Sequence, residues 1–541
     1  HFTAYGVPEG GHNAGMAHVG VRELLTELSY PFEMAVKAGA LSLMTAYNEV
    51  DGIPCTANPF LTNQLLRDQW GFSGFVVSDL YAIDGLMSQR VAAGRDEAGI
   101  LALRSGVDSD LGGNCFSADL VRACREGRLA EADIDRAVSR ILRLKFKMGL
   151  FDNPYVKVKK AEKLIGTPGH REVAREVARQ SVVLLKNENQ LLPLSKEVKR
   201  VAVIGPNADN VYNQLGDYTA PQAPGSVITV LEGIRQKLPG AEVRYVKGCA
   251  VRDTLDTSIG EACETAKNSD VVVVVLGGSS ARDFETDFLE TGAAVANERK
   301  VSDMESGEGF DRIGLSLMGK QVELLKTLYA TGKPVVLVMI QGRPLELNWA
   351  AEHIPAILTT WYPGGEGGRA IADVLFGDYN PAGRLPLSYP RHVGQLPVYY
   401  NHKSAERHDY VEGTAAPLYP FGFGLSYTTF VYEGIDVRVE GDSVRVSVDV
   451  KNVGGRAGDE VVQLYLRDEQ ASVVTPFMQL KAFQRVHLTS GESRRVEFVL
   501  TGEHLRVLDA SLNWRVEPGW FTVMIGASSQ DIRQRTRFRI D

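Results

Sequence analysis

The first 150 residues alternate between short apolar runs and longer stretches in which apolar residues recur at helical spacing. The apolar runs predict strands, and the helical periodicity between them predicts helices. Regular alternation of the two is typical of βαβ units with a parallel sheet. The predicted strands span residues 1–5, 40–47, 74–79 and 106–110, and the predicted helices span 21–38, 58–68, 96–104, 117–126 and 131–148.

Two different patterns follow. Residues 170–390 contain nearly continuous runs of Val and Ile, which predict a sheet covered on both faces. From residue 430 onward apolar and polar residues alternate with a period of two and no helical pattern intervenes, which predicts an immunoglobulin-like sandwich of about seven strands. The predicted strands are 201–205, 243–247, 271–278, 334–340 and 356–361, and then 436–450, 459–467, 480–488, 493–500 and 520–526.

A chain of 541 residues is long enough for roughly three domains. An eight-stranded barrel takes about 250 residues, so the four predicted strands of the first domain amount to half a barrel. The predicted fold class is α/β: the C-terminal half of a (β/α)8 barrel, with the rest missing or on another chain, then an α/β sandwich domain and a β-sandwich. The chain opens on His1, and we expect an N-terminally truncated or cleaved polypeptide. The predicted boundaries are 1–151 for the half barrel, 152–169 for a linker, 170–390 for the α/β sandwich, 391–429 for a second linker and 430–541 for the β-sandwich.

Charge and composition exclude several classes of function. The formal net charge of -8 and the pI near 5.8 argue against nucleic-acid binding, which needs clustered Lys and Arg. No apolar run reaches the ~20 residues of a membrane span. The five cysteines have neither CxxC pairs nor metal-ligand spacing, so they predict neither a disulfide framework nor a zinc site.

The first candidate for chemistry is Asp79. It ends the apolar run 74–79, and a barrel presents its catalytic residues at the C-terminal ends of its strands. The alternative is an aspartate that caps the next helix.

The second candidate is Glu308, in the polar stretch between residues 279 and 312. Long loops inside compact domains are usually functional or disordered. Gly307 and Gly309 flank Glu308 and would let the backbone enter a cleft. A flexible acidic loop is the alternative interpretation, and Glu305 is the nearest rival residue.

Several separated motifs, in this order, resemble glycoside hydrolase family 3, most closely its periplasmic-type bacterial β-glucosidases. The resemblance runs essentially from end to end of the chain. The motifs are HFTAYGVPEGG at 1–11, GFSGFVVSD at 71–79, LLKN at 184–187, WYPGGEGG at 361–368, LFGDYNPAG at 375–383 and YPFGFGLSY at 419–427.

The resemblance implies a retaining, exo-acting β-glycosidase. It would release terminal non-reducing β-D-glucose from oligosaccharides or aryl glucosides by double displacement. The Ser-Asp motif places the nucleophile on Asp79, and the glycine-flanked glutamate places the acid/base on Glu308. No cofactor and no metal are implied, and the C-terminal domain would be of the fibronectin type III kind.

Substrate-binding positions follow from the same resemblance. His1 matches a histidine that hydrogen-bonds sugar hydroxyls, and Met44 and Tyr47 belong to a segment beside the nucleophile. Leu80 stands where many relatives have an aromatic residue or histidine directly after the nucleophile. This departure leaves the choice between glucose and xylose open.

The implied partners are a β-linked oligosaccharide or aryl glucoside and the missing N-terminal barrel half on a separate or cleaved polypeptide. A homodimer is left open, no nucleic acid or membrane partner is expected, and the implied location is periplasmic or extracellular. Two alternatives remain: a β-xylosidase of the same family, and a non-catalytic carbohydrate-binding remnant.

Overall fold

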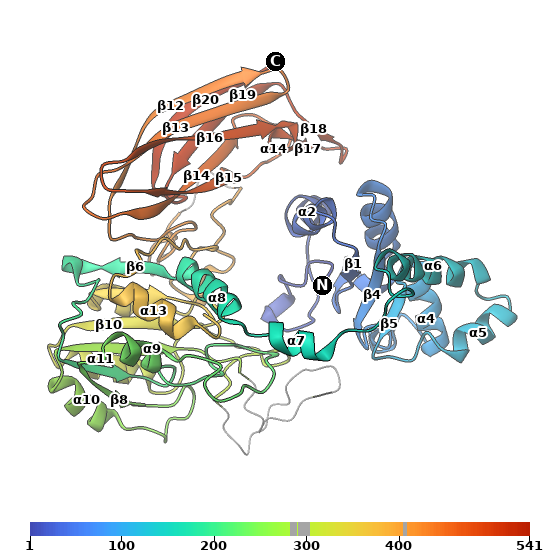
Figure 1. Cartoon of the computed structure of the whole chain (residues 1–541). Helices are drawn as coiled ribbons and strands as arrows, with labels where there is room; N and C mark the ends of the chain where they lie inside the picture. The colour runs from blue at the N-terminus through green and yellow to red at the C-terminus, as the bar shows by residue number, and fades with distance from the viewer. Residues whose placement is uncertain (282–288, 290–302, 404–407) are drawn as a thin grey trace. The chain divides into compact units, whose positions relative to one another are not determined.

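A computed structural model describes residues 1–281, 289, 303–403 and 408–541 (Figure 1). Its contacts divide the chain into two compact units. The first unit contains His1–Leu164 together with Glu308–Ile313, and the second contains most of the remaining chain. The segment that carries Glu308 therefore belongs, by its contacts, with the N-terminal part of the chain.

The first unit is built on a parallel sheet of three strands in the order β1-β4-β5. Phe2 adds an isolated parallel bridge to Thr45, next to β1. The predicted alternation of strands and helices is confirmed. The strands are β1 Ser42–Met44, β4 Phe75–Leu80 and β5 Ser109–Leu111, with a small hairpin of β2 Glu49–Val50 and β3 Ile53–Pro54. The helices and helical turns are η1 Glu9–Gly11, α1 Val21–Glu23, η2 Leu24–Leu28, α2 Tyr30–Lys37, η3 Cys55–Ala57, η4 Phe60–Gln69, α3 Gly85–Ser88, α4 Arg95–Arg104, α5 Ala118–Arg125, α6 Glu131–Lys147 and α7 Val158–Leu164.

Two predictions for this unit are wrong in detail. Residues 1–5 do not form a strand, because the chain turns after Phe2 and Ala4 adopts a positive φ of 64°. The single helix predicted over 21–38 is interrupted at Ser29, since a π-helical turn ends at Leu28 and α2 begins at Tyr30 with Pro31 in its first turn. Proline lacks an amide hydrogen and therefore fits the first turn of a helix better than its interior.

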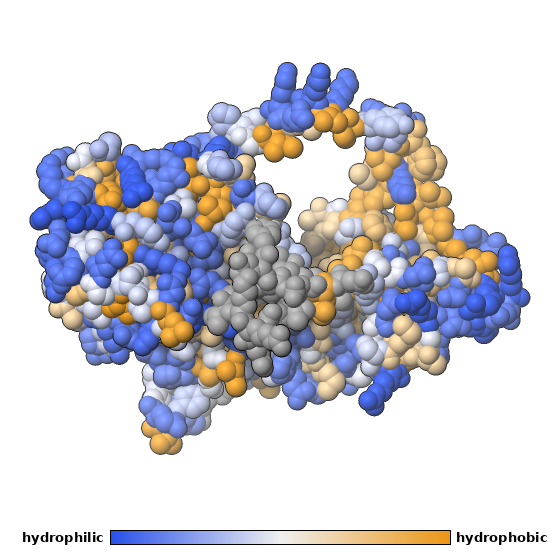
Figure 2. All heavy atoms as spheres, turned by 90° about the horizontal axis from the view of Figure 1, so that it is seen from below, coloured by the Kyte–Doolittle hydropathy of each residue, from blue (hydrophilic) through white to orange (hydrophobic). Residues whose placement is uncertain are grey.

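The sheet of the first unit does not close into a barrel within the described residues. Apolar side chains remain exposed along one face of α6, at positions four residues apart: Val138, Leu142 and Phe146, the last 66% exposed. Hydrophobic surface, drawn in orange, gathers on the right of the view in Figure 2, where this unit lies. An unclosed barrel sheet leaves such surface uncovered.

The second unit begins with a six-stranded sheet in the order β6-β11-β10-β9-β7-β8. All neighbours are parallel except β6, which runs antiparallel to β11. The strands are β6 Val183–Asn187, β7 Arg200–Ile204, β8 Glu242–Val246, β9 Val271–Gly277, β10 Val335–Ile340 and β11 Ala356–Thr359. The helices are α8 Pro168–Ser181, η5 Glu188–Gln190, α9 Val230–Lys237, α10 Ile259–Lys267, α11 Gln321–Tyr329, α12 Asn348–His353, α13 Gly367–Leu375 and η6 Val393–Gln395.

Both faces of this sheet are buried, as its continuous apolar runs predict. On β9, Val272 and Val274 belong to the core that includes α10 and α11. Val273 and Val275 point the other way, into the core that includes α9 and α13. Successive side chains of a strand alternate between faces, so a strand buried on both sides must be apolar throughout.

The C-terminal part of the second unit is an antiparallel sandwich. One sheet has the order β12-β13-β16 and the other β15-β14-β19-β20, which agrees with the predicted fold. The prediction of one strand over 436–450 is wrong, because Gly441 turns the chain with a φ of 59° between β12 and β13. The elements are β12 Phe430–Glu440, β13 Ser443–Asn452, β14 Gly458–Asp468, β15 Gln479–Leu488, β16 Ser493–Thr501, α14 Gly502–Leu505, β17 Val507–Leu508, β18 Trp514–Arg515, β19 Gly519–Gly526 and β20 Ile532–Ile540.

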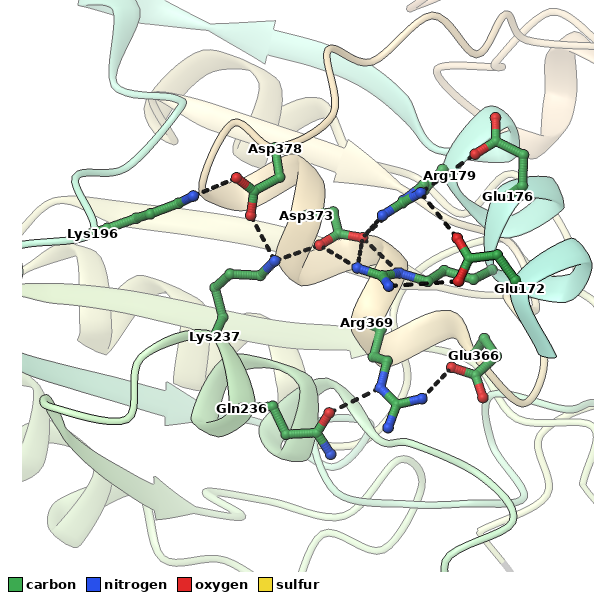
Figure 3. A network of polar contacts seen from close by, with 11 residues as sticks. Glu172, Glu176, Arg179, Lys196, Gln236, Lys237, Glu366, Arg369, Asp373 and Asp378 are labelled. Atoms are coloured by element: carbon green, nitrogen blue, oxygen red, sulfur yellow. Dashed lines mark hydrogen bonds and ion pairs between the residues drawn. The ribbon is translucent and has the colours of Figure 1, made fainter. Parts of the chain in front are cut away.

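A buried carboxylate ties three helices of the second unit together (Figure 3). Asp373 of α13 is fully buried, and it pairs with Arg175 and Arg179 of α8 at 2.7 Å and with Lys237 of α9 at 2.5 Å. Burial opposes ionisation of Asp373, but the three cations outweigh it and lower its pKa. Asp378 extends the network by pairing with Lys237.

We expect Asp373→Ala to destabilise the second unit by about 3–5 kcal/mol, because removing one partner of a buried ion pair leaves the others uncompensated. Hydrogen exchange of peptides from α8 and α13, measured across a urea series, would report the loss. Glu264→Ala is the matched control, since Glu264 pairs with Lys267 on an exposed face of α10 and should change stability by less than about 1 kcal/mol. Equal effects of the two changes would contradict a structural role for the buried network.

Candidate active site

Asp79 lies near the C-terminal end of the central strand β4 and is only 7% exposed. Ser78 holds this strand end in place. Its hydroxyl accepts a hydrogen bond from the Leu111 amide of β5 at 2.9 Å and donates to the Asp79 carbonyl at 2.9 Å. The next helix, α3, begins at Gly85 and is preceded by Asp84, so Asp79 is not a helix cap.

His1 contacts the Asp79 carboxylate directly. Its Nε2 lies 2.9 Å from Oδ2 of Asp79. The hydrogen bond with Asp79 raises the pKa of His1 against the opposing effect of burial, and the charges of Asp79 and Glu308 add to the increase.

Two tyrosines surround this pair. The ring of Tyr5 stacks on His1, with centroids 4.7 Å apart and planes 8° apart. The hydroxyl of Tyr47 donates to the Leu80 carbonyl at 2.8 Å. Burial, followed by the charges of Glu308 and Asp79, raises the pKa of Tyr5 to about 12. Burial and the Asp79 carboxylate also raise the pKa of Tyr47, so both phenols stay protonated at neutral pH.

Met44 and Leu80 lie on neighbouring strands of the same sheet. Met44 ends β1, and its carbonyl accepts a hydrogen bond from the Phe2 amide at 2.9 Å. Leu80 ends β4, and its side chain packs against the backbone of Gly112. If residue 112 had a side chain, its Cβ would lie 2.5 Å from the Leu80 side chain, which is too close. Gly112 thus gives Leu80 the room it occupies beside the candidate nucleophile.

Glu308 belongs to the same compact unit as Asp79. Its charge contributes to the raised pKa of His1, Tyr5 and Tyr47. The rival Glu305 lies in the second unit. It is 3% exposed, and its carboxylate accepts a hydrogen bond from the Ser306 hydroxyl at 3.2 Å. Glu308 thus shares a compact unit with Asp79, whereas Glu305 belongs to the other unit.

Other acids near the sheet have structural partners. Asp108 is buried and pairs with Arg67 at 2.7 Å and with Arg140 at 2.8 Å. Asp84 and Asp110 lie together with the Cys115 thiol, the one such group of possible metal ligands found within the described ranges. Asp84 also pairs with Arg95 at 3.2 Å.

Sequence reasoning missed Tyr5 and Asn13. The Tyr5 hydroxyl donates to the Asn13 side-chain oxygen at 3.0 Å. Both residues lie within or next to the motif at 1–11, but the turn at Ala4 that brings Tyr5 over His1 has no signal in the hydrophobic pattern.

The raised pKa of His1 makes a testable prediction. By NMR of the histidine ring, His1 should titrate above its ordinary value of 6.5 and return toward that value in Asp79→Asn. Asp79 stabilises the protonated ring of His1, so the charged contact is present at low pH. The contact is lost as the pH rises through the pKa of His1 in the folded state. A pKa of His1 at or below 6.5, or an unchanged pKa in Asp79→Asn, would contradict the contact.

Comparison with known proteins decides the family. The N-terminal domain model of glycosyl hydrolase family 3 matches residues 1–144, its C-terminal domain model matches 182–427, and a fibronectin type III-like domain model matches 460–529. A β-xylosidase from Formosa agariphila is 40% identical, over 98% of this chain and 73% of that protein. The chain belongs to glycoside hydrolase family 3.

Other members of the family are similar over the same extent. A periplasmic β-glucosidase from Salmonella typhimurium is 36% identical over 99% of this chain and 72% of its own length. The solved β-glucosidase of Erythrobacter marinus is 40% identical with a TM-score of 0.91, covering all of this chain and 73% of that one. A Listeria innocua β-glucosidase solved with laminaribiose is 34% identical with a TM-score of 0.90, and the match covers 100% of this chain and 73% of that one.

The chain is thus a glycoside hydrolase of the β-glycosidase type, with a fibronectin type III-like domain. In the described ranges, no helix is both long enough and apolar enough to cross a membrane.

Proposed function

We propose that this protein is a retaining, exo-acting β-glucosidase that removes terminal non-reducing β-D-glucose from oligosaccharides or aryl glucosides. The observation that carries the proposal is the gathering of Asp79, His1, Tyr47 and Glu308 in one compact unit, with Asp79 buried at a strand end. Two carboxyl groups on opposite sides of a glycosidic bond are the machinery of this reaction.

In the first step an oxygen of Asp79 attacks the anomeric carbon as the bond to the leaving oxygen breaks. Glu308 gives its proton to that oxygen, so the aglycone leaves as a neutral alcohol or phenol. In the second step the Glu308 carboxylate takes a proton from water. The water oxygen bonds to the anomeric carbon, and the ester to Asp79 breaks. The two inversions retain the β configuration, and the two carboxyl groups should lie about 5–5.5 Å apart.

His1 and Tyr47 would act by keeping Asp79 ionised and oriented. The positive charge of His1 at 2.9 Å favours the carboxylate. The hydroxyl of Tyr47 is held by the Leu80 carbonyl and lies beside Asp79. His1, Met44, Tyr47 and Leu80 are the proposed contacts of the terminal sugar.

A β-xylosidase is the second candidate, because the Formosa agariphila relative carries that name and is 40% identical. In favour of glucose are the Salmonella typhimurium relative and the Listeria innocua enzyme, which was also solved with glucose. Measurement of kcat/KM on p-nitrophenyl glucoside and xyloside, side by side, tests the choice. A clear preference for the xyloside would overturn the assignment to glucose.

The proposal applies to the assembled enzyme, by which we mean this chain together with a segment that supplies the other barrel strands, covalently joined or separate. The three strands of the described sheet leave apolar surface along α6 for such a segment to cover. A native mass measurement would detect a second polypeptide, and the same measurement tests for a homodimer. Absence of a completing segment together with absence of turnover would favour the carbohydrate-binding remnant.

A periplasmic or extracellular location is proposed from the name of the Salmonella typhimurium relative.

A further inference from the structure

Asp311 joins the segment that carries Glu308 to a loop of the N-terminal sheet. The backbone N–H of Asn13 donates to Oδ2 of Asp311 at 3.1 Å. The same oxygen lies 3.5 Å from Nδ1 of His12. The hydrogen bond joins residues 298 positions apart, and both contacts lie within one compact unit.

The loop that receives Asp311 also reaches the partner of the candidate nucleophile. The Asn13 side chain accepts the hydrogen bond of Tyr5 at 3.0 Å, and the Tyr5 ring stacks on His1 at 4.7 Å. His1 in turn lies 2.9 Å from Asp79. A continuous series of contacts therefore runs from Asp79 to a residue three positions after Glu308.

Glu308 lies in a short turn, and a contact just beyond that turn would fix its position. Gly307 and Gly309 flank it, and Gly309 adopts a φ of 70°. Glycine loses more conformational freedom on ordering than any other residue. A displacement of about 1 Å can reduce the rate by about 10²-fold when the reacting groups must meet in one geometry.

We propose that Asp311 is a positioning residue for the acid/base reaction: by binding the Asn13 amide and His12, it holds Glu308 at the leaving oxygen above Asp79. This inference rests on the proposed function, because it assumes that Glu308 is the acid/base. Asp311 itself touches neither substrate nor Asp79 in this account.

The test compares two substrates of the assembled enzyme. Protonation by Glu308 matters for cellobiose, whose leaving alcohol is a poor leaving group, and hardly matters for 2,4-dinitrophenyl glucoside. We expect Asp311→Ala to lower kcat/KM on cellobiose by about 10- to 100-fold and to change kcat/KM on the dinitrophenyl substrate by less than about 3-fold.

Two further variants separate positioning from a general loss of structure. Asp311→Asn keeps an oxygen that can accept from the Asn13 amide, so it should restore most of the cellobiose activity lost in Asp311→Ala. Glu9→Gln changes an exposed carboxylate on the same loop, which pairs only weakly with His18 at 3.4 Å, and should behave like the parent on both substrates.

Equal losses on the two substrates, or no loss on cellobiose, would overturn the inference. Its failure can be distinguished from failure of the proposed function by Glu308→Gln. If that variant loses cellobiose activity selectively and Asp311→Ala does not, only the positioning role is wrong. If Glu308→Gln has no selective effect, the acid/base assignment itself is wrong.

Discussion

Asp79→Asn is expected to reduce kcat of the assembled enzyme by at least about 10³-fold on every glycoside tested, because an amide cannot form the glycosyl ester. Asparagine has nearly the shape of aspartate, so the packing at the end of β4 should survive. The loss should therefore be seen even with a dinitrophenyl glucoside, whose departure needs no acid. Steady-state kinetics and an unfolding curve measured on the same sample would separate lost chemistry from lost structure.

A chemical trap tests the same role directly. A 2-deoxy-2-fluoro glucoside with a good leaving group should form a stable ester with the parent enzyme, and mass spectrometry of peptides should locate the ester on Asp79. The asparagine variant should remain unlabelled. Asp51→Asn is a matched control, since Asp51 lies in an exposed turn with a φ of 53°, a conformation that asparagine tolerates. A label on another residue would contradict the assignment of Asp79.

Glu308→Ala is expected to have the second largest effect, and its pattern should differ from that of Asp79→Asn. On cellobiose kcat/KM should fall by about 10²- to 10⁴-fold, the usual contribution of general acid catalysis. On 2,4-dinitrophenyl glucoside kcat/KM should change little, because the first step proceeds without a proton. The second step still lacks its base, so the glycosyl ester should accumulate and appear as a burst of dinitrophenolate.

Azide should rescue Glu308→Ala, since this anion attacks the glycosyl ester without base catalysis. The product should be the β-glycosyl azide, because two displacements retain the configuration. Glu305→Gln is the comparison variant: it should show neither azide rescue nor selectivity between leaving groups, because Glu305 is buried in the second unit. An α-glycosyl azide from Glu308→Ala would contradict the role of Glu308 as acid/base. Azide rescue of Glu305→Gln would assign the acid/base role to Glu305 instead.

The layers of the fold could be predicted because strands and helices follow from the local periodicity of apolar residues. The runs at 74–79 and 271–278 were recognised as strands since a parallel strand buried on both faces must be apolar along its length. Turns were less predictable: Ala4 and Gly441 change the direction of the chain through positive φ angles, and apolar periodicity carries no information about them. The strand predicted at 1–5 and the single strand predicted over 436–450 were wrong for this reason.

The candidate site, too, has features that local sequence predicts and features that it does not. Asp79 could be predicted as a candidate nucleophile because an apolar run ends in a carboxylate at the place where a barrel strand presents its catalytic residue. Neither the stacking of Tyr5 on His1 nor the contact between Asp311 and Asn13 was recognisable, because each depends on a loop path and the second joins residues 298 positions apart.

By itself, then, the amino-acid sequence determined the layered architecture, the family resemblance and the carboxylate at the end of β4, since all three are written in local patterns of residue type. Only the tertiary structure decided that Glu308 shares a compact unit with that carboxylate and that Glu305 is buried in the other unit. Glu305 and Glu308 are three positions apart in the sequence but belong to different compact units, and the long-range contacts that divide them are not encoded by any local pattern.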